Sequence, residues 1–166
     1  MISETTLAQL AGIALTGRPL LICDVDEVVV HFTRDFEDFL AERALWLDTS
    51  SFALNGNIRH RDGNQPVENA RVAELIDTFF AERTLHMQPI DGVIDSLMEI
   101  GTAADVVLLT NLPHSAGEDR RRNLAMHGLP FPVVTNSGPK GPAIRQLAER
   151  ARAPTVFVDD SPAFIA

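Results

Sequence analysis

The sequence predicts an α/β protein: a Rossmann-like, three-layer core in which helices cover both faces of a parallel β-sheet. Four short apolar runs alternate with longer segments in which apolar residues recur at helical spacing. Such strand–helix–strand alternation requires right-handed crossovers, which place helices on both faces of a parallel sheet. Each apolar run also ends in polar residues, and in such sheets ligands bind beyond the carboxyl ends of the strands.

The four expected strands share a continuous apolar character, which is typical of strands buried on both faces. They are residues 20–23 before Asp24, residues 106–109 before Thr110 and Asn111, residues 132–135 before Asn136, and residues 155–158 before Asp159 and Asp160.

Helices are expected before and between these strands. Ser3 is placed as the N-cap of the first. A second, which starts near Val93, is expected to stop at Gly101. Ser115 and Glu118 have the spacing of a capping box for a third, and Pro142 suits the first turn of a fourth.

Between residues 30 and 89 the pattern changes to two amphipathic helical stretches rich in phenylalanine, residues 32–47 and 72–80. Asn55-Gly56, between them, is a hairpin-turn signal. The segment is too long for a simple crossover. We therefore expect an α/β core formed by residues 1–30 and 89–166, with a small, mostly helical cap, residues 31–88, inserted after the first strand.

Composition narrows the functional classes. The 166 residues include 23 acidic and 14 basic side chains, for a net charge of −9, which argues against nucleic-acid or membrane-surface binding. Cys23 is the only cysteine, so an internal disulfide and a cysteine-built zinc site are excluded. The sequence shows no signal peptide and no apolar run of membrane-spanning length, and we expect a cytoplasmic protein.

The polar strand ends predict a site for phosphoryl chemistry. Asp24 and Asp26 are two residues apart, so both carboxylates are expected to point the same way, and Asp159 and Asp160 bring two more to this edge. Four converging carboxylates repel one another without a cation, and Mg²⁺ is the simplest counterion for an all-oxygen site.

Two further residues suit an anionic substrate at this edge. Thr110 offers a hydroxyl group. Lys140, the only lysine among the 14 basic residues, offers a compact ammonium just before a helix start.

The segments around Asp24 and Asp26, Thr110 and Asn111, Lys140, and Asp159 and Asp160 resemble the four motifs of the haloacid dehalogenase (HAD) superfamily. The resemblance implies a Mg²⁺-dependent phosphatase that acts on a small phosphorylated metabolite. It implies Asp24 as the nucleophile that forms an aspartyl-phosphate, and Asp26 as the general acid and base. Thr110, Asn111 and Lys140 would bind phosphate. Asp24, Asp159, Asp160 and the backbone carbonyl of Asp26 would bind the metal.

Two alternatives remain open at this point. A phosphomutase or another phosphotransferase of the superfamily would carry the same motifs. A receiver-like, phospho-accepting signalling domain also combines acidic residues, a threonine and a lysine, although its acidic residues precede the lysine, whereas Asp159 and Asp160 follow Lys140. One departure from the family pattern is Glu27, where glycine is common.

Other features carry weaker expectations. Arg120, Arg121 and Arg122 are placed on an exposed helix face, and His114 in a solvated loop. Four residues of the cap are candidates for contact with the substrate, and the sequence does not choose among them: His31, Arg34, Arg59 and Arg61. The strand at 155–158 is expected beside that at 20–23, with an unpaired outer edge. Such an edge favours association between copies unless the first helix covers it or the chain is a truncated form.

Overall fold

The structure is a computed structural model and describes residues 2–51 and 53–161. Its core contains a parallel sheet of four strands in the order β5-β4-β1-β6. The strands are β1 (Leu20–Cys23), β4 (Asp105–Thr110), β5 (Val133–Thr135) and β6 (Thr155–Val158). All four strands lie where the apolar runs predict them, and β6 pairs with β1 as expected.

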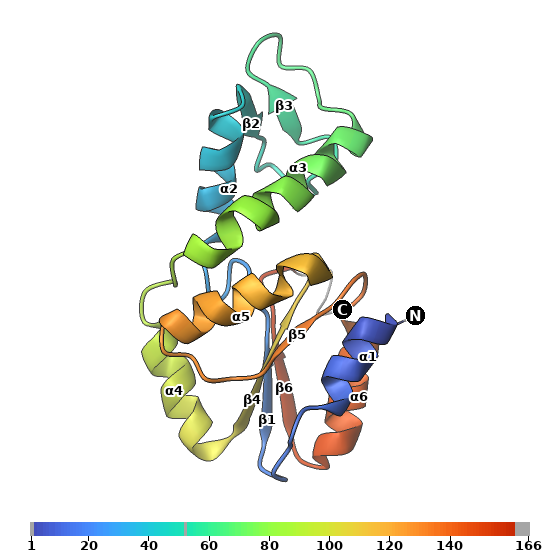
Figure 1. The fold of residues 1–166 in the computed structure, drawn as a ribbon, viewed down its shortest axis with the longest axis vertical. Helices are drawn as coiled ribbons and strands as arrows, with labels where there is room; N and C mark the ends of the chain where they lie inside the picture. Colours follow the sequence, from blue (N-terminus) through green and yellow to red (C-terminus); the bar gives the residue numbers. More distant parts are fainter. Residues whose placement is uncertain (1, 52, 162–166) are drawn as a thin grey trace.

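Helices cover both faces of this sheet (Figure 1). The helices α1 (Glu4–Ala11) and α6 (Gly141–Ala151) lie on one face, and α4 (Val93–Ala103) and α5 (Gly117–Met126) lie on the other. One buried apolar cluster joins the sheet to α1 and α6, and includes Leu10, Ile22 and Leu147. A second cluster on the opposite face continues into the inserted segment. The α/β sandwich is thus confirmed.

The first helix is capped as predicted but does not cover the outer edge of β6. The Ser3 Oγ accepts a hydrogen bond from the Thr6 amide at 3.1 Å. The Thr6 hydroxyl donates to the Thr135 carbonyl oxygen at 2.9 Å, which fixes α1 over β5 at the other side of the sheet. Among the described residues, β6 pairs only with β1, and Val156 and Val158 on it are exposed.

The inserted segment forms a separate layer above the carboxyl ends of the strands (Figure 1). It contains α2 (Phe32–Ala41), β2 (Leu45–Leu47), β3 (Ile58–His60) and α3 (Asn69–Arg83). The expectation of a helical pattern up to Leu47 is wrong: α2 ends at Ala41, and Ala44 adopts a φ of 57° that turns the chain into β2. The strands β2 and β3 are antiparallel, and Asn55-Gly56 lies in the turn between them.

Two other helix-end predictions are wrong. The helix α4 continues past Gly101 to Ala103. A β-carbon on Gly101 would lie 2.9 Å from the Phe131 ring, so the glycine provides space for packing instead of ending the helix. The Ser115–Glu118 capping box does not form, because a 3₁₀ turn, His114–Ala116, precedes α5, whose N-cap is Ala116.

The two segments that join the core to this layer are hydrogen-bonded to each other. The His31 amide donates to the Gln88 carbonyl at 3.0 Å, and the Ile90 amide donates to the Val29 carbonyl at 2.9 Å. A single bridge between Val30 and Pro89 lies between these bonds. The chain therefore leaves and re-enters the core at neighbouring positions.

Of the helices described, none has both the length and the apolar character to cross a membrane.

Candidate active site

The site is built by the sheet edge that faces the inserted layer. Asp24 follows β1, Thr110 is the last residue of β4, and Asp159 follows β6. Lys140 is the N-cap of α6. Because parallel strands end at one edge, these residues from distant parts of the chain meet there, and the predicted site residues are brought together.

Lys140 forms the centre of the charged cluster. Its Nζ lies 2.6 Å from Asp24 Oδ1 and 2.7 Å from Asp159 Oδ2. The lysine is 2% exposed and the Asp159 side chain is fully buried, so this contact between them is largely removed from bulk water. A compact ammonium fits between two carboxylates at these distances, whereas the planar guanidinium of arginine needs more room.

Burial raises the pKa of Asp24 to about 7, and the negative charge of Asp26 acts in the same direction. The charge and hydrogen bond of Lys140 and the amide of Val25 pull the pKa down but do not outweigh the burial. The Val25 amide donates to Asp24 Oδ1 at 2.7 Å, so Oδ1 receives both this amide and the lysine. The carboxylate is therefore held in one orientation.

Three carboxylates form a group that fits a divalent cation. One oxygen from each of Asp24, Asp159 and Asp160 lies within 4.8 Å of the others. Burial and the neighbouring charge of Asp159 raise the pKa of Asp160. Lys140 balances only one of these three negative charges. An all-oxygen cluster with excess negative charge suits a hard cation such as Mg²⁺.

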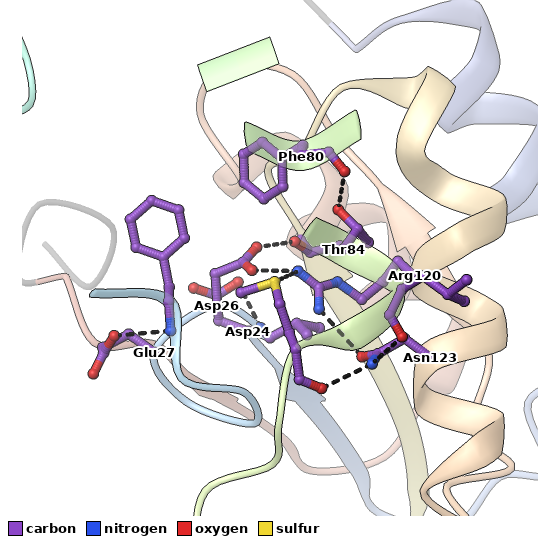
Figure 2. Close-up of polar contacts among 12 residues, drawn as sticks. Asp24, Asp26, Glu27, Phe80, Thr84, Arg120 and Asn123 are labelled. Carbon is purple, nitrogen blue, oxygen red and sulfur yellow. Dashed lines mark hydrogen bonds and ion pairs between the residues drawn. The ribbon is translucent and has the colours of Figure 1, made fainter. Parts of the chain in front are cut away.

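The Asp26 carboxylate lies apart from this group and is held by two other residues. The Thr110 hydroxyl donates to Asp26 Oδ2 at 2.8 Å. Arg120 from α5 donates to Asp26 Oδ1, and Figure 2 shows the two side chains pointing toward each other. The expectation that Arg120 lies on an exposed helix face is wrong, because its side chain is fully buried.

The same face of α5 contacts the segment that leads from the insertion back to the core (Figure 2). The Asn123 amide donates to the carbonyl oxygens of Leu85 and Met87, at 3.1 and 2.8 Å. Arg120 also lies 3.3 Å from the Met87 sulfur. Sequence reasoning missed both polar residues. Their spacing of one helical turn places them on the same helix face, but nothing in the local sequence marks that face as the buried one.

Glu27 adopts a φ of 62°, a left-handed conformation that glycine enters more easily. Its carboxylate accepts hydrogen bonds from the backbone amides of Phe32 and Thr33, at 3.1 and 2.6 Å. These are free amides of the first turn of α2, where a negative charge is favourable. The glutamate therefore caps the first helix of the insertion (Figure 2).

Asn111 is fixed by the loop that follows β5. Its amide donates to the Gly138 carbonyl at 2.9 Å, and its Oδ1 accepts from the buried Asn136 at 2.8 Å. The expectation that His114 lies in a solvated loop is wrong: it begins the 3₁₀ turn before α5, and its ring nitrogens lie 3.0 Å from Ser3 Oγ and 2.6 Å from Thr135 Oγ1.

A cavity of about 560 Å³ lies between the sheet edge and the insertion. From the core it is lined by Asp24, Asp26, Glu27, Asn111, Lys140 and Asp160. From the insertion it is lined by Phe32, Thr33, Leu47, Thr49, Ser50, Ser51, Ala53, Leu54, Ile76 and Phe80. His31, Arg34, Arg59 and Arg61 do not line it.

Comparison with solved structures identifies the fold. The chain is similar to a class C acid phosphatase from Bacillus anthracis, crystallised with tungstate, with a TM-score of 0.52 and 15% identity over 92% of this chain and 55% of the phosphatase. It is also similar to a haloacid dehalogenase-like hydrolase from Xanthomonas campestris, with a TM-score of 0.51 and 16% identity over 90% of this chain and 77% of that one.

The chain has a HAD-like fold. No protein-family model and no curated protein sequence matches it. The HAD-like core carries the four groups that the motifs predicted at one sheet edge. The chain spans about half the length of the acid phosphatase, so the two are compared at the level of the fold.

Proposed function

We propose that this protein is a Mg²⁺-dependent phosphomonoester hydrolase that works through an aspartyl-phosphate on Asp24. The observation that carries the proposal is the division of the two motif aspartates. Asp24 is paired with Lys140 beside Asp159 and Asp160, whereas Asp26 is held separately by Thr110 and Arg120. Two carboxylates in different surroundings suit the separate roles of nucleophile and proton carrier.

In the first step, an Asp24 oxygen attacks phosphorus and the bond from phosphorus to the ester oxygen breaks. Both described contacts of this carboxylate are made by Oδ1, so Oδ2 is the proposed attacking atom. Lys140 favours the charged form of Asp24 and attracts the phosphoryl oxygens. Asn111, which lines the cavity, is the further proposed phosphate contact. The Thr110 hydroxyl donates to Asp26 and Thr110 does not line the cavity, so its proposed role is to hold Asp26 instead of the phosphate.

Asp26 is the proposed proton carrier for both steps. Its carboxyl group gives a proton to the departing ester oxygen, and the carboxylate then takes a proton from the water that attacks the phosphoaspartate. Water attack releases inorganic phosphate and restores Asp24. Thr110 and Arg120 hold the Asp26 carboxyl group at the wall of the cavity while this occurs.

Asp24, Asp159 and Asp160 would hold the cation, with the Asp26 carbonyl oxygen as the further ligand that the resemblance implies. When bound, Mg²⁺ neutralises charge on the phosphoryl oxygens and orients them. The similarity in fold to an acid phosphatase supports the proposal that this protein hydrolyses phosphate esters.

The test is hydrolysis of p-nitrophenyl phosphate with Mg²⁺ by the wild type, by Asp24→Asn, and by Asp77→Asn as an exposed control on α3. We expect Asp24→Asn to lose turnover by at least about a thousandfold with its circular dichroism spectrum kept, because the amide is not a nucleophile. Asp77→Asn should match the wild type. Full activity in Asp24→Asn would contradict the mechanism.

The same assay separates the alternatives. Phosphorylation that stops at one equivalent per chain, without release of phosphate, would favour a receiver-like domain. Transfer of the phosphoryl group to a second hydroxyl of the substrate, instead of to water, would favour a phosphomutase.

A further inference from the structure

We infer that the substrate is a monophosphate ester whose organic group is uncharged and largely apolar, with no second phosphate or carboxylate. The inference rests on the proposed function and concerns the half of the cavity formed by the insertion. The proposed phosphoryl site and this half are continuous, because the same cavity is lined by residues of the core and of the insertion. An ester with its phosphorus at Asp24 must therefore place its organic group against the insertion.

The wall opposite the phosphoryl site is apolar. It consists of Phe32 at the start of α2, Leu47 on β2, Leu54 in the following turn, and Ile76 and Phe80 on α3. The Phe32 and Phe80 rings lie 5.9 Å apart and are tilted by 32°. Removing apolar surface from water on both sides favours a hydrocarbon or ring against this wall.

Among the described lining residues of the insertion, the polar side chains are all hydroxyls: Thr33 on α2 and Thr49, Ser50 and Ser51 after β2. A hydroxyl donates one hydrogen bond, accepts hydrogen bonds through its oxygen, and carries no charge. These residues suit an alcohol, ether or ring heteroatom on the substrate. They do not compensate the loss of water around a second anion.

Charge in the cavity argues against such an anion more directly. Four of the charged residues that line it are acidic, namely Asp24, Asp26, Glu27 and Asp160. The only cation among the described lining residues is Lys140, which already contacts both Asp24 and Asp159. A second phosphate in the other half would meet no positive charge and would face acidic neighbours at one end.

The arginines of the insertion are engaged away from this cavity. Their described partners are Asp35 for Arg34, Glu82 for Arg43, Asp48 for Arg59, the Leu45 carbonyl for Arg61, Glu74 for Arg71, and Glu42 for Arg83. None of these arginines lines the cavity, so the described lining residues of the insertion include no cationic side chain.

The first experiment measures kcat/KM with Mg²⁺ for 1-naphthylmethyl phosphate, a hexose 6-phosphate and a hexose 1,6-bisphosphate, so that the apolar ester and the hexose 6-phosphate both release an alkyl alcohol. We expect 1-naphthylmethyl phosphate to exceed the hexose monophosphate by about tenfold or more, and the bisphosphate to be the poorest, because differences in pocket contacts of this size give such ratios. Equal or better hydrolysis of the bisphosphate would overturn the substrate class alone. Failure to hydrolyse any ester would overturn the proposed function instead.

The second experiment places a cation on the apolar wall. Ile76→Arg should lower the kcat/KM ratio of 1-naphthylmethyl phosphate to hexose bisphosphate by at least about tenfold, through loss of apolar contact and gain of an anion partner. Ile100→Arg, an exposed position on α4 outside the cavity, is the matched control and should leave the ratio unchanged. Ser50→Arg, at an exposed lining position, tests the same shift if Ile76→Arg does not fold. An unchanged ratio in the folded lining variants would overturn the inference.

Discussion

At the scale of single residues, the ion pair between Arg120 and Asp26 joins α5 to the site at the sheet edge. The arginine side chain is fully buried, and the aspartate side chain is 16% exposed. A buried ion pair adds little stability over an apolar pair, but removal of one partner leaves the other charge without compensation. The role of this pair is therefore to fix where the Asp26 carboxylate points.

We expect Arg120→Met to destabilise the fold by about 3 kcal/mol and to lower kcat by more than it changes KM, because the Asp26 carboxyl group loses its orientation. Urea denaturation and steady-state kinetics measure the two effects. Arg122→Met is the control, since Arg122 lies on the exposed side of α5, 3.5 Å from Asp119. Its effect on stability should stay within about 0.5 kcal/mol. Equal effects of the two substitutions would show that Arg120 has no special role.

A second prediction at this scale follows from the raised pKa of Asp24. Folding raises this pKa from 3.8 to about 7, so the folded protein binds more protons than the unfolded chain within that range. The stability of the metal-free protein should therefore decrease as the pH rises from about 4 to about 7. Asp24→Asn should weaken this dependence and be more stable than the wild type at pH 8. Thermal unfolding in chelator across this range tests the prediction, and a wild-type melting temperature that rises between pH 5 and 8 would contradict it.

A site residue can be predicted from the sequence when it adjoins the end of a recognisable strand or helix. Asp24, Thr110, Lys140 and Asp159 each lie at or beside the end of a regular element, so the chain itself places them at the edge. Arg120 lies within a helix beside Arg121 and Arg122, and nothing local distinguishes the buried arginine from the exposed ones. Only the position of α5 against Asp26 and Met87 does so.

At the scale of elements, Glu27 connects the phosphoryl site to the first helix of the insertion. Its backbone has the positive φ of the tight turn after β1, and its side chain satisfies the amides at the start of α2. A glycine here would relieve the backbone but leave these amides without their carboxylate. The glutamate thus combines an unfavourable backbone conformation with a favourable helix cap.

These two opposing effects predict that the Glu27→Gly variant is more stable than the Glu27→Ala variant. Glu27→Ala should cost about 1 kcal/mol, because alanine loses the cap and keeps the unfavourable φ. Glu27→Gly should remain close to the wild type, because the relief of about 1 kcal/mol in the left-handed region offsets the lost cap. Urea denaturation of both variants in chelator tests this. A finding that alanine is as stable as glycine at this position would show that the positive φ carries no cost.

Predictability at this scale depends on whether local signals agree with tertiary structure. The four core strands are predictable because continuous apolar runs match strands buried on both faces. The end of α2 was missed because apolar residues continue past it, and Ala44 gives no turn signal despite its positive φ. Ser115 has the spacing of a cap, but the 3₁₀ turn before α5 places it outside the N-cap position.

For the whole molecule, the acidic cluster predicts a dependence on divalent cations. Adding Mg²⁺ should raise the melting temperature, since a ligand at one hundred times its Kd stabilises the folded state by about 2.7 kcal/mol. Asp160→Asn should weaken this shift, because it removes one of the three clustered carboxylates. Excess chelator should stop hydrolysis, and Mg²⁺ should restore it. Full activity in chelator, or an equal shift in the variant, would contradict the proposed site.

The arrangement of the whole molecule was only partly predictable from sequence. The neighbour relation of β1 and β6 was expected, but the direction in which α1 packs was not, because its contact with β5 depends on Thr6 and Gln9 meeting Thr135. The cavity likewise depends on how the insertion lies over the sheet. The fold is similar to that of proteins only 15–16% identical to this chain.

The paired connecting segments have a consequence for how such a protein can evolve. The insertion departs at His31 and returns at Gln88, whose backbone groups are hydrogen-bonded at 3.0 Å, so both of its ends occupy one point of attachment. A longer, shorter or unrelated segment could begin and end at that point without altering the register of β1, β4 or β6. If the proposed function holds, the residues that react with phosphorus and those that select the alcohol lie in separate segments, so mutation could exchange the second set while selection preserves the first.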